Sequence, residues 1–195
     1  FTNNTIDANH SGIEVQYGDS HIISNNLIEN FIEHGIYYEC TENIEITSNV
    51  ITTLDHTSET GDIHGIFNSC TNQNARIEYN EMNLKNYPSN NCNDPTGNIW
   101  GITANNSQIS NNIILIENLH DNCSHNRERI FPIRGYSSYI TNNSITMIKG
   151  RANWCDTNDS WAIESYRSGD DRGYIAYNDI YLLNDAQDSC HRLNG

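Results

Sequence analysis

A short pattern of apolar and polar positions occurs seven times along the chain. Each copy has an apolar residue, two mostly polar positions, an Asn, one variable residue and a second apolar residue, as in the segment 46–51, Ile-Thr-Ser-Asn-Val-Ile. The Asn residues are Asn4, Asn26, Asn49, Asn80, Asn112, Asn143 and Asn178, separated by 22, 23, 31, 32, 31 and 35 residues. The apolar residues three positions before them are Phe1, Ile23, Ile46, Ile77, Ile109, Ile140 and Ile175, and those two positions after them are Ile6, Ile28, Ile51, Met82, Ile114, Ile145 and Ile180. A unit recurring at this period predicts a repeat architecture.

A second apolar motif lies between successive Asn residues. It is Gly-Ile in the first four copies, then Pro-Ile and Ala-Ile, with its Ile at Ile13, Ile36, Ile66, Ile102, Ile133 and Ile163. From this Ile to the next Asn is 10 to 15 residues, whereas the distance from an Asn to the next such Ile varies from 9 to 22. Because insertions belong in loops, we expect long inserts on one edge of the molecule, in the C-terminal repeats.

Each repeat therefore predicts three short strands, one at the Gly-Ile motif, one before the Asn and one after it. The 27 Ile residues against 8 Leu favour strands, and the 32 Asn residues favour turns. We place the repeated Asn in a turn that needs a left-handed backbone, and expect the side-chain amides to stack as a ladder above rows of interior Ile. The predicted fold is all-β, a right-handed parallel β-helix of about six coils.

Residues 1–195 are expected to form a single solenoid of this kind. A solenoid needs its open ends covered, and the sequence carries no evident cap at either end. We therefore expect a segment of a longer protein, or a unit that stacks on its neighbours.

The repeats resemble the parallel β-helix repeats of the pectate-lyase-like superfamily, and the resemblance covers all 195 residues. It implies the fold, but that superfamily includes polysaccharide lyases, glycoside hydrolases, sugar epimerases, tailspikes and adhesins. The resemblance therefore implies no single function. It also implies that the Gly-Ile strands floor a glycan groove that the inserts wall on one side.

Charge narrows the range of partners. The chain has 25 acidic against 10 basic residues, a net charge of −15, which opposes binding to nucleic acid or to an anionic membrane surface. The longest aliphatic run, residues 113–116, is too short to span a bilayer. The expected partners are carbohydrate or copies of the chain itself, with no nucleic acid and no membrane insertion.

The six cysteines occupy matching places in successive repeats. Neighbouring coils of a β-helix lie within disulfide reach, so pairing neighbours predicts Cys40–Cys70, Cys92–Cys123 and Cys155–Cys190. Free thiols, with Cys40 and Cys70 as small buried hydrophobic residues, are the alternative. Disulfides indicate an oxidising, extracellular setting: secreted, on a cell surface or on a virion. Glycosylation sequons agree with that setting, and they lie at Asn3, Asn9, Asn105, Asn122, Asn142 and Asn158.

Candidate site residues follow from the alternation of the Gly-Ile strands, where the residue after each inward Ile faces out. This column reads Glu14, Tyr37, Phe67, Thr103, Arg134 and Glu164, and the column two residues further on reads Gln16, Glu39, Ser69, Asn105, Tyr136 and Tyr166. For an enzyme, the candidates are Arg134, Glu164, Tyr136 and Tyr166, with Arg neutralising a uronate carboxylate while Tyr or Glu exchanges a proton. The alternative is a surface ion pair with ordinary aromatic packing, so no catalytic residue is assigned.

Aromatic residues on the same strands are candidates for stacking on sugars, namely Tyr37, Phe67, Trp100 and Trp161. His34 and His64 align one coil apart at the strand entry, in a column that continues as Trp100, Phe131 and Trp161. No metal site or cofactor is predicted. Calcium is the one candidate, at acidic loop residues without regular ligand spacing, namely Asp55, Glu59, Asp170 and Asp171.

Two functions from different classes remain. One is an extracellular or virion-surface β-helix acting as a structural rod, fibre or adhesin element, glycan-binding or glycosylated. The other is a polysaccharide lyase, hydrolase or epimerase acting on an acidic glycan. Because cysteines and sequons spread along the whole chain and no carboxylates converge, the residue pattern favours the first.

Overall fold

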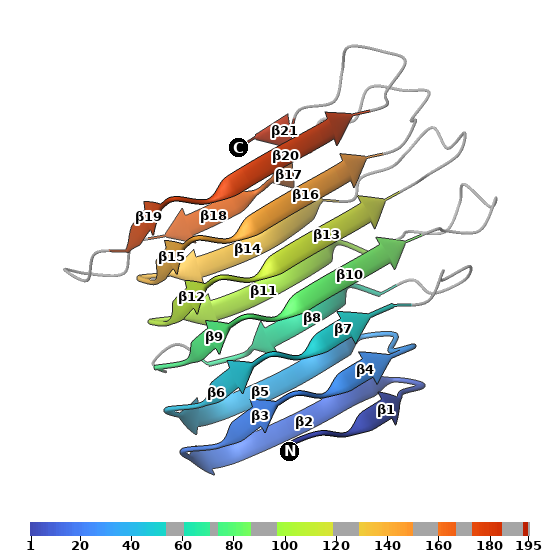
Figure 1. Cartoon of the computed structure of the whole chain (residues 1–195), viewed down its shortest axis with the longest axis vertical. Coiled ribbons are helices and arrows are strands. Elements are labelled where there is room, and N and C mark those ends of the chain that lie inside the picture. The colour runs from blue at the N-terminus through green and yellow to red at the C-terminus, as the bar shows by residue number, and fades with distance from the viewer. Residues whose placement is uncertain are drawn as a thin grey trace.

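In the computed structural model, the chain winds through three parallel sheets that stack coil upon coil (Figure 1). The structure describes residues 1–53, 61–70, 74–86, 97–118, 129–149, 160–166, 173–184 and 193–194, and none of these is helical. This arrangement confirms the predicted all-β parallel β-helix. The segments expected as inserts lie largely outside the described residues.

Each coil passes through the three sheets in the same order. The first sheet contains β2 (Ser11–Asp19), β5 (His34–Glu42), β8 (Ile63–Asn68), β11 (Ile99–Asn105), β14 (Ile130–Tyr136) and β18 (Ile163–Tyr166). The second contains β3 (Ile22–Ser24), β6 (Glu45–Thr47), β9 (Arg76–Glu78), β12 (Gln108–Ser110), β15 (Tyr139–Thr141) and β19 (Tyr174–Ala176). The third contains β1 (Thr5–Asp7), β4 (Leu27–Glu29), β7 (Val50–Thr52), β10 (Glu81–Asn86), β13 (Ile113–Asn118), β16 (Ser144–Lys149) and β20 (Asp179–Asn184). A separate pair joins β17 (Ser160–Trp161) to β21 (Leu193–Asn194).

The repeated Asn residues form the predicted ladder between the second and third sheets. In each step the backbone N–H and the side-chain Nδ2 of one Asn donate to Oδ1 of the next, as from Asn80 to Asn112 at 3.0 Å each. The same bonds join every successive pair from Asn4 to Asn178.

The left-handed backbone lies one residue earlier than predicted. Positive φ occurs at the residue before each ladder Asn, at Asn3, Asn25, Ser48, Tyr79, Asn111, Asn142 and Tyr177, and not at the ladder Asn itself. The prediction was wrong on this point because the ladder side chain must point inward, so the preceding residue makes the turn and faces solvent. The ladder Asn residues are therefore selected for hydrogen bonding rather than for backbone conformation.

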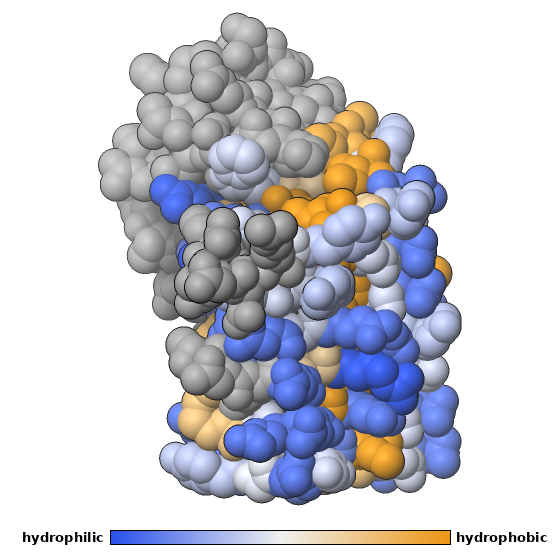
Figure 2. All heavy atoms as spheres, turned by 90° about the vertical axis from the view of Figure 1, so that its left-hand side faces the viewer, coloured by the Kyte–Doolittle hydropathy of each residue, from blue (hydrophilic) through white to orange (hydrophobic). Residues whose placement is uncertain are grey.

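The Ile rows beside the ladder fill the interior of the inner coils. Ile23, Ile46, Ile77, Ile109 and Ile140 are each fully buried. The corresponding residues of the outermost described coils are not buried, because no further described strand stacks on them: Phe1 is 61% exposed and Ile175 is 48% exposed. Figure 2 shows the side that carries the second sheet, where the lower coils are largely hydrophilic and hydrophobic atoms gather towards the C-terminal end.

The glycine before the inward Ile in the first sheet also faces the interior, and this sets which neighbouring side chains lie on the outer face. A Cβ at Gly35 would lie 2.7 Å from the carbonyl oxygen of Gly65 and 2.6 Å from the Ile51 side chain, so this position faces the interior. Both Gly35 and Ile36 therefore point inward. The residues of β5 that flank this pair, His34 before it and Tyr37 after it, face outward.

Candidate functional site

The strand register places the predicted outward residues side by side along the axis of the solenoid. One outer column of the first sheet follows the pairings Glu14–Tyr37–Phe67–Thr103–Arg134–Glu164, as the sequence predicted. A neighbouring column pairs His34, His64, Trp100 and Phe131. The outer face of the first sheet is therefore the candidate functional site.

An aromatic strip, defined here as His34, Tyr37, His64, Phe67, Trp100 and Phe131, covers this face over four coils. Ring centroids of His34 and His64 lie 5.1 Å apart, those of His64 and Trp100 5.8 Å apart, and those of Trp100 and Phe131 4.2 Å apart, all in stacked orientation. Tyr37 stacks on Phe67 at 6.0 Å. The strip is thus a continuous layer of rings and not a set of isolated side chains.

The rings of the strip differ in their exposure to solvent. His64 and Phe131 are buried, at 9% and 3% exposure, whereas Tyr37, Phe67 and Trp100 are only partly buried. The three partly buried rings were predicted from sequence as sugar-stacking residues. From the sequence, His64 and Phe131 were placed only at the entry of their strands. Their alignment with Trp100 in one column was the sequence feature that could have indicated that they support the exposed rings.

Trp161, the fourth sugar-stacking candidate, lies at the end of this face but not in a strand of the first sheet. Its strand β17 pairs with β21, and Trp161 is 40% exposed. The Ile130 N–H donates to Ser160 Oγ at 3.1 Å, which places β17 beside the start of β14. The ring is therefore available at the C-terminal end of the face.

Carboxylates border the strip at its N-terminal half. Trp100 Nε1 donates to Asp62 Oδ2 at 3.3 Å, so this acid holds the indole in the plane of the stack. Glu33 Oε2 lies 3.0 Å from His10 Nε2 and 3.7 Å from His34 Nδ1. Glu14 is exposed beside Tyr37 in the same column.

The two histidines of the strip are electrically neutral near pH 7. Burial, with a smaller contribution from the adjacent His34, lowers the pKa of His64 to about 3. Burial also lowers the pKa of His34, against the opposing effect of Glu33 and Glu14. Both imidazoles therefore act as aromatic rings and not as cations.

The candidate catalytic cluster comes together, but its arginine is already engaged. Arg134 Nε lies 3.1 Å from Glu164 Oε2, and its guanidinium carbon lies 5.0 Å from the Trp100 ring and 5.4 Å from the Tyr136 ring. Tyr136 and Tyr166 pair in register, while the Tyr166 side chain lies outside the described residues. This geometry agrees with the ion-pair alternative considered from the sequence.

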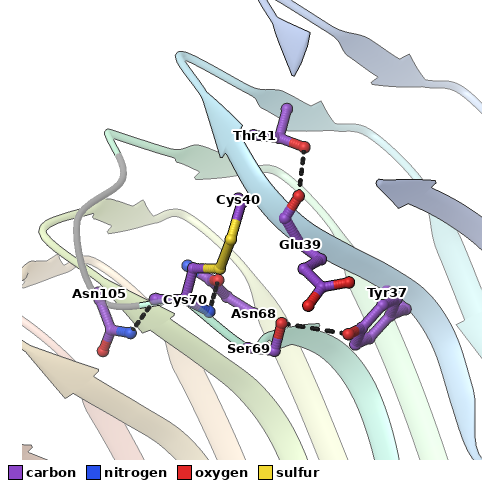
Figure 3. Close-up of a disulfide and its surroundings, with 8 residues drawn as sticks. All are labelled: Tyr37, Glu39, Cys40, Thr41, Asn68, Ser69, Cys70 and Asn105. Atoms are coloured by element: carbon purple, nitrogen blue, oxygen red, sulfur yellow. Dashed lines mark hydrogen bonds between the residues drawn. A yellow bond between two sulfur atoms is a disulfide. The ribbon is translucent and has the colours of Figure 1, made fainter. Parts of the chain in front are cut away.

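The Cys40–Cys70 disulfide forms as predicted and ties β5 to the end of β8 (Figure 3). The Cα atoms are 5.3 Å apart and 30 residues apart in sequence. Tyr37 Oη donates to Ser69 Oγ at 3.1 Å, and Glu39 lies between the disulfide and Tyr37. Cys40, Cys70 and Glu39 are close enough to hold a metal ion, but both sulfur atoms are committed to the disulfide. Such a bond is typical of proteins outside the cytosol.

Other sequence predictions fall partly outside the described residues. Cys92, Cys123, Cys155 and Cys190 lie there, as do Asn122, Asn158 and the candidate calcium ligands Asp55, Glu59, Asp170 and Asp171. The sequon residues Asn3, Asn9 and Asn142 are exposed. Asn105 is only 8% exposed and its Nδ2 donates to the Cys70 carbonyl oxygen at 2.5 Å, so it is inaccessible for glycosylation in the folded chain.

Within the described part of the chain, no helix is long and apolar enough to cross a membrane. Comparison with known proteins found no match: no family model fits the sequence, and no curated protein or solved structure is significantly similar.

Proposed function

We propose that this β-helix is an extracellular binding protein, a rigid rod or adhesin element whose first sheet binds carbohydrate. The observation that supports this proposal is the aromatic strip, which leaves Tyr37, Phe67 and Trp100 partly exposed on one flat face. Pyranose rings carry apolar C–H faces that pack on aromatic rings, while their hydroxyl groups need hydrogen-bond partners at the edges. Aromatic rings bordered by carboxylates and a tyrosine hydroxyl offer both.

The supporting structure is rigid, which favours binding over a mobile loop. Each ring projects from a paired strand and contacts a neighbouring ring, and Phe67 and Trp100 also contact the buried rings of His64 and Phe131. Little conformational freedom is therefore lost when a ligand binds. The rings follow the solenoid axis from β5 to β11. A linear glycan lying along that axis would contact successive rings.

The extracellular part of the proposal rests on the disulfide and the exposed sequons. Peptide mapping without reduction tests it, and we expect Cys92–Cys123 and Cys155–Cys190 to be recovered beside Cys40–Cys70. Recovery of the other four cysteines as free thiols from freshly isolated protein would contradict this assignment.

Binding is tested with a glycan array and titration calorimetry. Trp100→Ala and Phe67→Ala should each weaken the binding of an identified glycan by about tenfold, since loss of an aromatic contact costs roughly 1 to 2 kcal/mol. Tyr79→Ala is the matched control, because Tyr79 is 61% exposed at the turn between the second and third sheets. Equal losses in all three variants, or no binding to any glycan, would overturn the proposal.

A polysaccharide-processing enzyme is the second candidate, supported by the proximity of Arg134, Glu164 and Tyr136 on the same face. If this cluster is catalytic, Arg134→Ala should lower turnover of an acidic polysaccharide by about two orders of magnitude or more. Release of unsaturated oligosaccharides from a uronate polymer by the unsubstituted protein, and its loss in the variant, would favour the enzyme. Absence of cleavage together with glycan binding would favour the adhesin.

A further inference from the structure

The charges around the aromatic strip bear on the class of glycan that it accepts. Glu14 pairs in register with Tyr37, Glu39 follows Tyr37 on the same outer face of β5, and Asp62 accepts the Trp100 N–H. Figure 3 shows the Glu39 carboxylate next to Tyr37. Negative charge thus borders the partly exposed rings in successive coils.

The positive charge in these outer columns is already compensated. Arg134, the cation in the column of Tyr37 and Phe67, holds Glu164 at 3.1 Å with its guanidinium near the Trp100 and Tyr136 rings. The opposite charges of Arg134 and Glu164 lie 3.1 Å apart and are largely removed from water, so an incoming carboxylate or sulfate would have to compete with Glu164 for the guanidinium. The histidines of the strip add no charge near pH 7, because burial lowers the pKa of both.

We propose that the strip selects uncharged glycans and rejects those carrying uronate, sialate or sulfate groups. This inference rests on the proposed function and specifies its ligand class. Carboxylates accept hydrogen bonds from sugar hydroxyls, so Glu14, Glu39 and Asp62 can bind neutral sugars that stack on the rings. The same carboxylates repel an anionic sugar, and the chain's net charge of −15 acts in the same direction.

The test uses immobilised oligosaccharides in matched pairs at pH 7. The neutral members are oligomers of glucose, galactose, mannose and N-acetylglucosamine, and their counterparts carry sialate, uronate or sulfate. At low salt we expect the neutral member of a bound pair to bind at least about tenfold more tightly, a difference of roughly 1.4 kcal/mol. The ratio should shrink at high salt, because exposed charges are screened over about 10 Å at 0.1 M salt.

Glu14→Gln provides the matched variant, since Gln keeps an acceptor oxygen and removes the charge. It should narrow the gap between neutral and acidic members at low salt from both sides, because an amide oxygen accepts a weaker hydrogen bond from a neutral sugar and no longer repels an acidic one. An unchanged gap in this variant would contradict the role of Glu14 in the selection. Acidic members that bind as tightly as their neutral counterparts, with Trp100→Ala weakening both, would overturn this inference and leave carbohydrate binding in place. Absence of binding to every array member would overturn both proposals.

Discussion

At the scale of single residues, the interior ladder Asn residues carry an unusual number of hydrogen bonds. Asn112 donates from Nδ2 to Asn143 Oδ1, Ile77 O and Ser110 O at 2.9 to 3.1 Å, and its Oδ1 accepts from the backbone and side chain of Asn80. The side chain is completely buried. Because each of these partners is also removed from water, loss of this amide leaves several groups unsatisfied.

Asn112→Val is predicted to lower the free energy of unfolding by about 3 to 5 kcal/mol, through unpaired buried donors and acceptors. Asn111→Val is the control, because Asn111 has φ 56° and a side chain that is only partly buried, outside the ladder. It should cost roughly 1 to 3 kcal/mol, from backbone strain alone. Urea denaturation monitored by circular dichroism measures both, and an Asn112→Val protein as stable as the unsubstituted chain would contradict the ladder's role.

At the scale of elements, β8 carries a titratable ring into the base of the aromatic strip. His64 stacks against His34 on β5 and Trp100 on β11, and its ring centroid is 4.3 Å from that of Phe67. This packing excludes water from the imidazole, which disfavours its charged form. The stability of the first sheet should therefore depend on pH through this residue.

Stability is predicted to fall as the pH is lowered from 6.5 towards 3. In this window the unfolded chain binds a proton at His64, with its ordinary pKa of 6.5, while the folded chain does not, with its pKa at about 3. Between pH 7 and pH 4 the unsubstituted protein should lose roughly 2 to 3 kcal/mol more than His64→Phe, which keeps the ring and cannot titrate. Thermal unfolding of both proteins at the two pH values measures the difference, and equal losses would show that His64 is not buried as a neutral ring.

At the scale of the whole molecule, each coil is stabilised by the coils on either side. Ile102, in the middle of the first sheet, is fully buried, whereas Ile175 in the outermost described coil is 48% exposed although its row is buried in the inner coils. In a stacked repeat, stability is approximately a sum of repeat and neighbour-interface contributions. An Ile in an inner coil should therefore contribute more to the free energy of unfolding than an Ile in an outermost coil.

Ile102→Ala is predicted to destabilise the fold by about 2 to 5 kcal/mol, because it leaves a cavity between filled coils. Ile175→Ala should cost less than about 1 kcal/mol, since little of its surface is removed from water. Urea midpoints measure both effects, and amide hydrogen exchange should show faster opening at β19 than at β11. Comparable costs at the two positions would indicate that another segment or a second copy covers the outermost coil.

The repeat pattern alone was enough to determine the fold, the Asn ladder, the strand register and the outward columns. These features depend on periodicity: an Ile, an Asn or a Cys at the same place in each coil must lie above its equivalent in the next. Only the tertiary structure decided which residue of the turn is left-handed, and that Arg134 is paired with Glu164 while His64 and Phe131 lie beneath partly exposed rings. Conformation, pairing and burial are set by neighbours brought together from different coils, and the order of residues within one coil does not specify them.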